Sequence, residues 1–169
     1  MSYKPKYDKS HFDQLVKKNF HFLEVDAEMD RGRVRSSGGT DPRDAALLIR
    51  YSGQTFRLDV GLREFEKLFA ISIKFHIEDL SNAERYALFE PFAEYLSGNK
   101  EKAIVPYITE GMSIKRIEAV MEQRQAVFRD GLPAVMEEVG KKLQAYLGQL
   151  QTASADQLRG YHQWMMSKC

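Results

Sequence analysis

Apolar residues at helical spacing mark the first element of the chain. In "SHFDQLVKKNFHFL", residues 10–23, they recur three or four positions apart, which places them on one face of an α-helix. This apolar stripe consists of Phe12, Leu15, Val16, Phe20 and Leu23. Ser10 and Asp13 form an S-x-x-D capping pattern, in which side chains satisfy free amides of the first turn. The pattern predicts an amphipathic helix that begins near Ser10.

Alternation of apolar and polar residues replaces the helical period between residues 47 and 75. The runs "LLIRY", "TFRLDV" and "LFAISIKF" have the two-residue period of half-buried strands. Ser52-Gly53-Gln54 separates the first two runs and indicates a hairpin. We expect a core-facing set of Leu47, Ile49, Phe56, Leu58 and Val60, and a water-facing set of Arg50, Arg57 and Asp59. These runs predict three antiparallel strands. The segment "GRVRSS", in the irregular stretch before them, is the candidate for a fourth strand.

The period becomes helical again from Ser81. Ser81 and Glu84 form an S-x-x-E capping box at the start of this stretch. Pro91 falls inside the pattern, so we expect a kink or a break there. Gly98 is the expected C-terminal stop, because glycine readily adopts the left-handed conformation that ends helices.

Three further helices complete the predicted order. They begin near Ile114, near Pro133 (which suits a first helical turn) and near Ser154, where Gln157 completes another capping pattern. The chain is therefore predicted to be a single α+β domain over residues 1–169. It would contain an N-terminal helix, a small antiparallel sheet of three or four strands in residues 1–78, and a helical half in residues 79–169.

Composition narrows the class of protein. The chain of 169 residues is 43% hydrophobic and 29% charged, as in ordinary globular domains, and carries a formal net charge of +1. This near balance argues against a dedicated nucleic-acid binder, which needs a surplus of cations to neutralise phosphates. No stretch has the apolar length of a signal sequence or a membrane span, and the single cysteine, Cys169, can make no internal disulfide. We expect a cytoplasmic protein that binds neither membrane nor nucleic acid.

The residue types of common active sites do not occur at the required spacings. The four histidines are His11, His21, His76 and His162, and none pairs with another at the i, i+4 spacing of a helical metal site. There is neither a G-x-S-x-G nucleophile elbow nor a phosphate-binding glycine loop followed by lysine. We expect no enzymatic activity, no cofactor and no metal.

Mixed charge instead points to a protein partner. Residues 26–44 contain four arginines and five acidic residues without interleaved aromatic residues, which suits charge complementarity with a protein better than RNA binding. The candidate partner contacts are Arg31, Arg33, Arg35, Asp41 and Arg43 of this segment, with Arg63 and Glu66 of the following charged turn. A solvated loop without a partner is the competing interpretation.

The first hundred residues resemble a pattern found in small bacterial toxin-immunity proteins. In that pattern a helix ending in Phe-Leu precedes a strand ending in Arg-Tyr, an Arg-Glu turn leads into a return strand, and a helical segment ends at a leucine before a small residue and glycine. The matching positions here are Phe22, Leu23, Arg50, Tyr51, Arg63, Glu64, Leu96 and Gly98. The resemblance implies a non-enzymatic antidote that neutralises a cognate toxin by direct binding. It carries over no catalytic or contact residue.

Two alternatives remain open. The first is a small-molecule-binding or enzymatic α+β domain whose pocket lies between the sheet and the C-terminal helices, with Tyr51, Tyr86, Trp164 and His76 as candidate lining residues. The second is an oligomerisation or scaffold module that uses the helical half.

Overall fold

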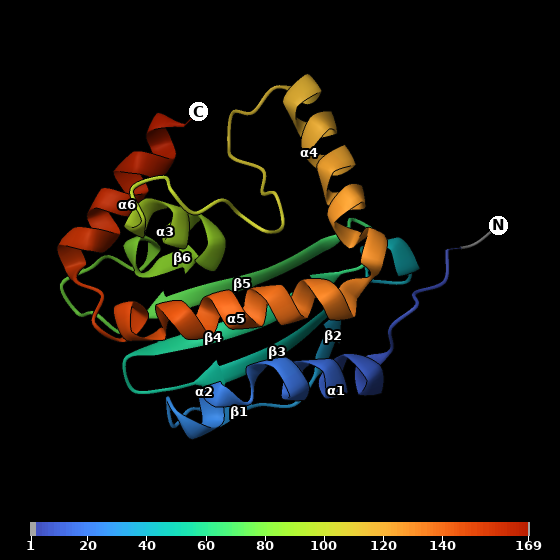
Figure 1. The fold of residues 1–169 in the computed structure, drawn as a ribbon, viewed down its shortest axis with the longest axis horizontal. Coiled ribbons are helices and arrows are strands. Elements are labelled where there is room, and N and C mark those ends of the chain that lie inside the picture. Colours follow the sequence, from blue (N-terminus) through green and yellow to red (C-terminus); the bar gives the residue numbers. More distant parts are fainter. Residues whose placement is uncertain (1–2, 169) are drawn as a thin grey trace.

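The computed structural model describes residues 3–168 and has an α+β fold (Figure 1). Cys169 lies outside the described residues. Helix α1 (Lys9–Phe20) and the single turn α2 (Phe22–Val25) precede the sheet. Phe12, Val16 and Phe20 of α1 are completely buried, so the predicted apolar stripe is confirmed. The helix begins earlier than predicted, because the Asp8 carboxylate accepts a hydrogen bond from the His11 amide and serves as the cap in place of Ser10.

Within residues 3–168 an antiparallel sheet of six strands forms the centre of the fold, which confirms the predicted α+β class but has more strands than the three or four predicted. The strands are β1 (Asp30–Arg31), β2 (Arg35–Ser37), β3 (Ala46–Ser52), β4 (Phe56–Arg63), β5 (Leu68–Phe75) and β6 (Tyr86–Leu88). The order is β1-β3-β4-β5-β6, and β2 also pairs with β3. The strands missed by the sequence prediction are two or three residues long, and so short a run shows little periodicity.

The predicted β3–β4–β5 meander is confirmed. Ile49 pairs with Val60, and Val60 pairs in turn with Ile71, so these three residues lie on one buried face. Arg50 and Asp59 also pair across the strands and project from the other face. Leu47 is only partly buried, because it lies near the end of β3.

The segment after Ser81 is not helical from its start, and the expected break lies before Pro91. The two reciprocal hydrogen bonds between Ser81 and Glu84 form, at 3.0 Å and 3.3 Å, but they lead into only the 3-10 turn η2 (Ala83–Arg85), whose N-cap is Asn82. Strand β6 follows, and the helix α3 (Phe89–Leu96) begins just before Pro91. Proline is tolerated there because amides of a first helical turn have no intrahelical partner.

Three longer helices complete the chain. They are α4 (Ile114–Val127), α5 (Leu132–Gln151) and α6 (Ala155–Ser167), with the 3-10 turn η3 (Phe128–Asp130) between α4 and α5. Pro133 lies in the first turn of α5, and Ser154 and Gln157 form a reciprocal capping box on α6, both as predicted. Gly98, with a φ of 66°, follows the end of α3 as expected.

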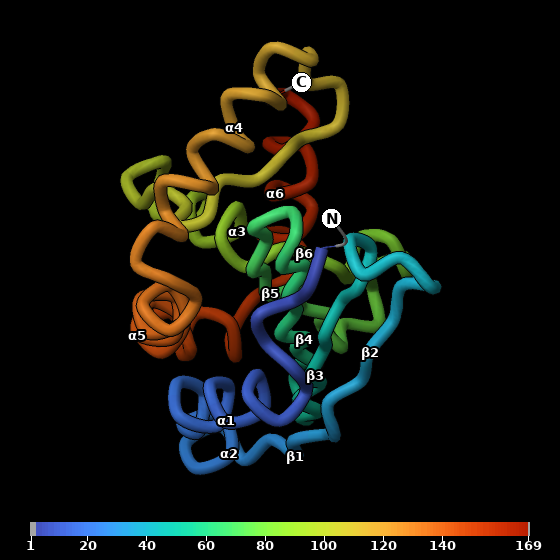
Figure 2. The backbone as a smooth tube through the Cα atoms, turned by 90° about the vertical axis from the view of Figure 1, so that its right-hand side faces the viewer, coloured from blue at the N-terminus to red at the C-terminus, as the bar shows by residue number. Residues whose placement is uncertain are grey.

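The helices gather on one side of the sheet. Turned by 90°, the backbone shows α1 and α5 side by side against the strands, with α3 and α6 above them (Figure 2). Among residues 3–168, no α-helix covers the opposite side of β3, β4 and β5. We call this uncovered side the outer face.

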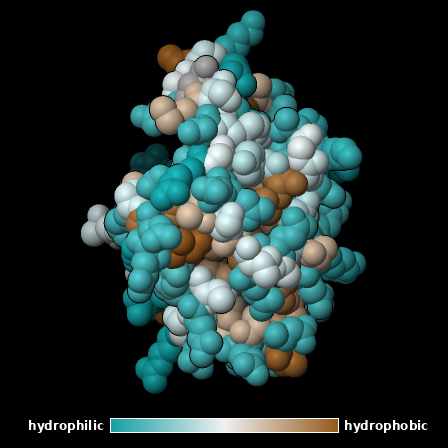
Figure 3. All heavy atoms as spheres, turned by 90° about the vertical axis from the view of Figure 1, so that its left-hand side faces the viewer, coloured by the Kyte–Doolittle hydropathy of each residue, from teal (hydrophilic) through white to brown (hydrophobic). Residues whose placement is uncertain are grey.

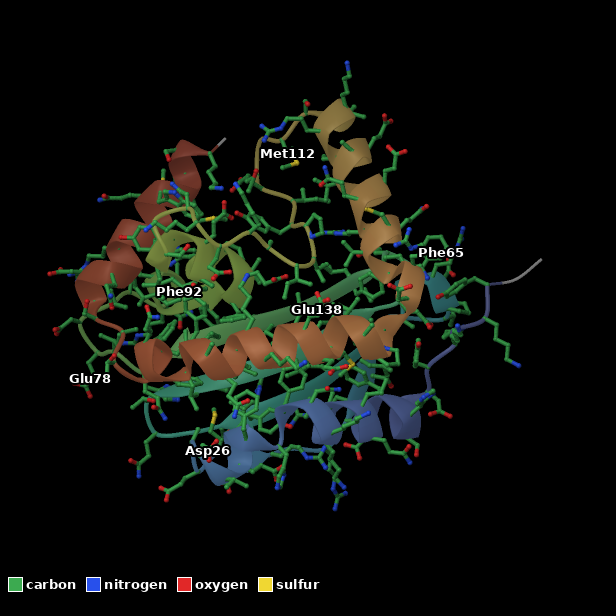
Figure 4. All side chains as sticks on the ribbon, viewed as in Figure 1. Asp26, Phe65, Glu78, Phe92, Met112 and Glu138 are labelled. Carbon is green, nitrogen blue, oxygen red and sulfur yellow. The ribbon has the colours of Figure 1, made fainter. Side chains whose placement is uncertain are left out.

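The chain before α1 reaches the turn between β4 and β5. Phe65 lies at this end of the sheet (Figure 4), and its ring centroid is 5.0 Å from that of Tyr3 in an edge-to-face arrangement. The amide of Lys6 donates to both carboxylate oxygens of Glu64, at 3.0 Å and 2.8 Å. The N-terminal segment is therefore held to the sheet by contacts with residues that are distant in sequence.

Candidate functional site

The outer face carries an apolar hollow of about 470 Å³. Gly61 and Ala70 lie at its floor on neighbouring strands, and their small size leaves room above the sheet. Leu48, Leu68 and Leu88 supply larger apolar side chains around them. Leu88 is 39% exposed, which is high for a leucine in a strand. An uncovered apolar area of this kind is a typical interaction surface.

Cations predominate among the charged side chains that the strand register places on this face. The cations are Arg35, Arg50, Arg57, Arg63 and Lys74, and the acids are Asp30 and Asp59. Arg50 donates from Nε and Nη2 to the two oxygens of Asp59, at 2.8 Å and 3.1 Å, and this pair neutralises itself. The remaining charge on the outer face is therefore mainly positive.

The structure separates the predicted partner contacts. Arg31 forms an ion pair with Asp13 of α1, and its side chain is only 13% exposed. This arginine therefore holds β1 to α1 and is poorly placed to meet a partner. Arg33 is exposed and lies beside that pair, at a shallow cavity that includes Lys9 and Ser10.

Asp41 and Arg43 bind each other. Arg43 donates from Nε and Nη2 to Asp41 Oδ2, at 3.0 Å and 2.7 Å, in the exposed 3-10 turn η1 (Pro42–Asp44). This mutual hydrogen bonding, led by the Arg43 side chain, holds the pKa of Asp41 below its usual range. The pair stabilises a turn, and it remains accessible to solvent.

Three predicted residues lie at cavities of the sheet. Arg35 and Arg63 line the hollow of the outer face. Glu66 lines a second cavity, of about 260 Å³, which follows the β5 edge at residues 68–71. That part of the edge is open because β6 pairs only with Ser72, Ile73 and Lys74. We call this second space the edge cavity.

The edge cavity lies between the sheet and the C-terminal half of the chain. Its lining comprises Leu68, Phe69, Ala70, Ile71 and Leu88 from the sheet, Glu66 from the preceding turn, Glu90 and Pro91 from α3, Val105, Tyr107 and Ile108 from the irregular segment 99–112, and Arg124 from α4. The lining is mostly apolar, with a few polar groups, as in small-molecule sites.

Buried charged side chains hold segment 99–112 in place. The Glu90 carboxylate accepts hydrogen bonds from the amides of Ile104 and Val105, at 2.6 Å and 2.8 Å. Lys142 of α5 lies 3.5 Å from the same carboxylate and donates to the Lys102 carbonyl at 2.9 Å. Burial nevertheless dominates and raises the pKa of Glu90, although these donors act in the opposite direction.

A second carboxylate secures the far side of the segment. Glu94 accepts a hydrogen bond from the Tyr107 hydroxyl at 2.7 Å, and Nζ of Lys168, the residue after α6, lies 3.3 Å from both groups. These side-chain contacts tie Tyr107 of the segment to α3 and to the residue that follows α6.

Arg124 is the most unusual charged residue of this region, because it is only 4% exposed. Its Nε donates to the Pro106 carbonyl at 2.8 Å, and its Nη1 lies 3.5 Å from the Met121 sulfur. No carboxylate among residues 3–168 lies within 4.0 Å of the guanidinium. Burial lowers the pKa of Arg124, and the charge of Glu66 only partly opposes this effect.

Glu90, Glu94 and Arg124 are absent from the sequence-based candidates. The two acids occupy an otherwise apolar stretch, "LFEPFAEYL", and acidic residues in such a context are a sequence signal for buried polar roles. Arg124 has no comparable signal, because its helix is rich in charged residues throughout.

The residues proposed to line a pocket in the alternative interpretation lie apart. Tyr51 is completely buried on the helix-covered face, whereas Tyr86 lies on the outer face with Lys74 Nζ 5.5 Å from its ring centroid. Trp164 packs against Tyr95 and Tyr161, with ring centroids 5.7 Å and 6.3 Å away. These aromatic residues therefore do not form one common site.

Comparison with known proteins gives no further assignment. The chain matches no protein-family model, no curated protein and no solved structure. Within residues 3–168 no three or more His, Cys, Asp or Glu side chains are placed to hold a metal ion. None of the helices in that range combines the length and apolar character needed to cross a membrane. The end of the molecule shown in Figure 3 is mostly hydrophilic, with small hydrophobic areas between.

Proposed function

We propose that this chain is a non-enzymatic, cytoplasmic immunity protein that neutralises a cognate bacterial toxin by direct binding. The observation that carries the proposal is the outer face, an uncovered antiparallel sheet with an apolar hollow and a surplus of cations. An apolar centre with a charged rim is the usual composition of a protein interface. The positive rim favours an acidic surface on the toxin, because complementary charge steers association and selects the partner.

The loose resemblance to toxin-immunity proteins supports the same function. Arg63, one of its matching positions, lies at the rim of the hollow, and Arg50 lies on the same face. Arg35 and Arg63 are therefore the predicted contacts that we retain for the interface. Arg33, Asp41, Arg43 and Glu66 would contribute only if the interface extends beyond the outer face.

Co-expression with a neighbouring toxin gene provides the functional test. We expect a toxin domain encoded beside this gene to arrest growth when expressed alone, and co-expression of this chain to restore growth. The two purified proteins should form a complex of defined stoichiometry. Failure of every adjacent toxin domain to bind or be neutralised would refute the proposal.

Charge reversal tests whether the outer face forms the interface. The variant Arg63→Glu/Lys74→Glu should weaken toxin binding by at least about tenfold, equivalent to ~1.4 kcal/mol, as measured by titration calorimetry at low salt. Arg33→Glu is the control for position on the surface, because this exposed arginine lies outside the hollow. Loss of binding in the control alone would assign the interface to the surface around Arg33 instead.

Small-molecule binding is the second candidate function, and the edge cavity favours it. The alternative prediction requires a pocket between the sheet and the C-terminal helices, and the edge cavity occupies that position. Its lining differs from the predicted residues, since Tyr51, Tyr86, Trp164 and His76 do not contribute to it.

A further inference from the structure

We propose that the edge cavity binds a small apolar monocarboxylate, whose carboxylate pairs with the guanidinium of Arg124. This inference rests on the second candidate function, small-molecule binding, and is independent of the outer face. Three features of the cavity carry it: a buried cation without an ion-pair partner among residues 3–168, an apolar lining, and two acidic lining residues that disfavour a ligand of higher negative charge.

The state of Arg124 supplies the first argument. Removal of a guanidinium from water costs several kcal/mol unless an anion and hydrogen-bond acceptors replace its hydration. Here the Pro106 carbonyl accepts one hydrogen bond from Nε, and the Met121 sulfur is a weak acceptor at Nη1. A ligand carboxylate would supply the missing anion and could accept from the guanidinium in the two-pronged geometry that arginine favours.

The shape and lining of the cavity define the rest of the ligand. Leu68, Leu88 and Ile108 are among its walls, so a hydrocarbon body would be removed from water there. The volume of about 260 Å³ lies below the range of ~300–1,000 Å³ typical of drug-sized ligands. A short-chain or single-ring carboxylate fits these limits.

The acidic groups of the cavity set the ligand charge. Both oxygens of Glu90 already accept backbone hydrogen bonds, and Lys142 lies beside one of them, so this carboxylate is occupied. Glu66 is half-buried and forms no ion pair with Arg124, but its charge acts on the guanidinium from a longer distance. A ligand carboxylate and the Glu66 carboxylate would both interact with the positive charge of Arg124. A dianion would be repelled more strongly than a monoanion by the negative charges of Glu66 and Glu90.

Titration of the full chain with hexanoate and with hexan-1-ol tests the proposal. We expect hexanoate to bind at least about tenfold more tightly than the neutral alcohol of equal chain length, as measured by calorimetry at pH 7. Chemical-shift changes at residues 68–71 and 105–108 should place hexanoate in the edge cavity. Arg124→Gln should abolish the preference for the carboxylate, and the exposed Arg129→Gln on the neighbouring turn η3 should leave it unchanged.

Glu66→Gln provides a test that loss of folding cannot imitate. Removal of the competing negative charge should tighten hexanoate binding several-fold and leave hexan-1-ol binding unchanged. Equal affinities of the two ligands in the native chain, or weaker hexanoate binding in Glu66→Gln, would overturn the carboxylate site. Binding of the alcohol alone would overturn it and still leave a small-molecule cavity, whereas binding of neither ligand would count against both the site and the second candidate function.

Discussion

Tyr51 is completely buried, and its hydroxyl has no hydrogen-bond partner among residues 3–168. Burial raises the pKa of this phenol, which stays neutral. A buried polar group without a partner costs about 1–3 kcal/mol, so its removal should be favourable. We expect Tyr51→Phe to raise the free energy of unfolding by up to about 1 kcal/mol, as measured by urea denaturation.

Tyr107 is the matched control for that substitution, because its hydroxyl donates to Glu94 and also contacts Lys168. Tyr107→Phe should lower the free energy of unfolding by about 1.5–3 kcal/mol, the range for hydrogen bonds to charged groups. A comparable loss in Tyr51→Phe would mean that the Tyr51 hydroxyl is satisfied in solution.

Glu90 should make stability depend on pH. Burial raises its pKa in the folded chain above the unfolded value, so its contribution is complete below the unfolded pKa of about 4.3. That contribution is lost as the pH rises through the folded pKa, because the ionised carboxylate is less well solvated inside the protein. Glu90→Gln cannot titrate and serves as the reference.

The measurement is urea denaturation of both proteins between pH 4 and pH 7. We expect the unfolding free energy of the native chain, relative to Glu90→Gln, to decrease with rising pH over this window. A relative stability that increases with pH would show instead that the amide donors and Lys142 outweigh burial.

At the scale of elements, Gly140 permits the close contact between α5 and α1. A Cβ atom at this position would lie 2.8 Å from the backbone oxygen of Asn19, so one helix would have to move. Gly140→Ala should therefore lower stability by about 1–3 kcal/mol despite the better helix propensity of alanine. At Gly148 on the same helix, a Cβ atom would meet nothing within 4 Å beyond the local helix backbone, and Gly148→Ala should raise stability by about 0.8–1 kcal/mol. Thermal unfolding should show a lower stability for Gly140→Ala and a higher stability for Gly148→Ala. The same change in stability for both variants would contradict the close contact between α5 and α1.

The sequence predicted those elements whose signals are local and long. Helix α1, the meander β3–β5 and the starts of α5 and α6 all follow from periodicity or capping within a dozen residues. Strand β6 was missed because the Ser81–Glu84 hydrogen bonds do form but lead into only one 3-10 turn. Pairing with β5, a long-range interaction, then makes residues 86–88 extended, and a local window contains no information about it.

The candidate site was predictable only in part, for the same reason. The alternation of β4 placed Arg57 and Asp59 on the solvent side correctly, and Arg63 follows the same alternation. The hollow also depends on which strands carry small residues opposite each other, as Gly61 and Ala70 do. The edge cavity brings together residues as far apart as Glu66 and Arg124, and no spacing along the chain indicates that proximity.

At the scale of the whole molecule, one continuous core joins the sheet-containing part to the helical half. Val16 of α1 and Leu143 of α5 belong to the same buried cluster as Ile49 and Ile73 of the sheet. Helix α5 therefore packs against both α1 and the strands, although more than a hundred residues separate Val16 from Leu143 in sequence (Figure 1). Parts that share one core in this way are expected to unfold together, as most small single domains do.

The single tryptophan makes this cooperativity measurable. Trp164 lies on α6, so its fluorescence reports on the C-terminal end, whereas far-ultraviolet circular dichroism reports on all elements. We expect both signals to change at one urea midpoint.

Val16→Ala, in the buried stripe of α1, should lower the free energy of unfolding by about 0.5–3 kcal/mol and move both midpoints equally. Lys17→Ala, at an exposed position of the same helix, should leave both midpoints nearly unchanged. A shift of the dichroism alone, with tryptophan fluorescence unaffected, would show that residues 79–169 unfold independently of the sheet.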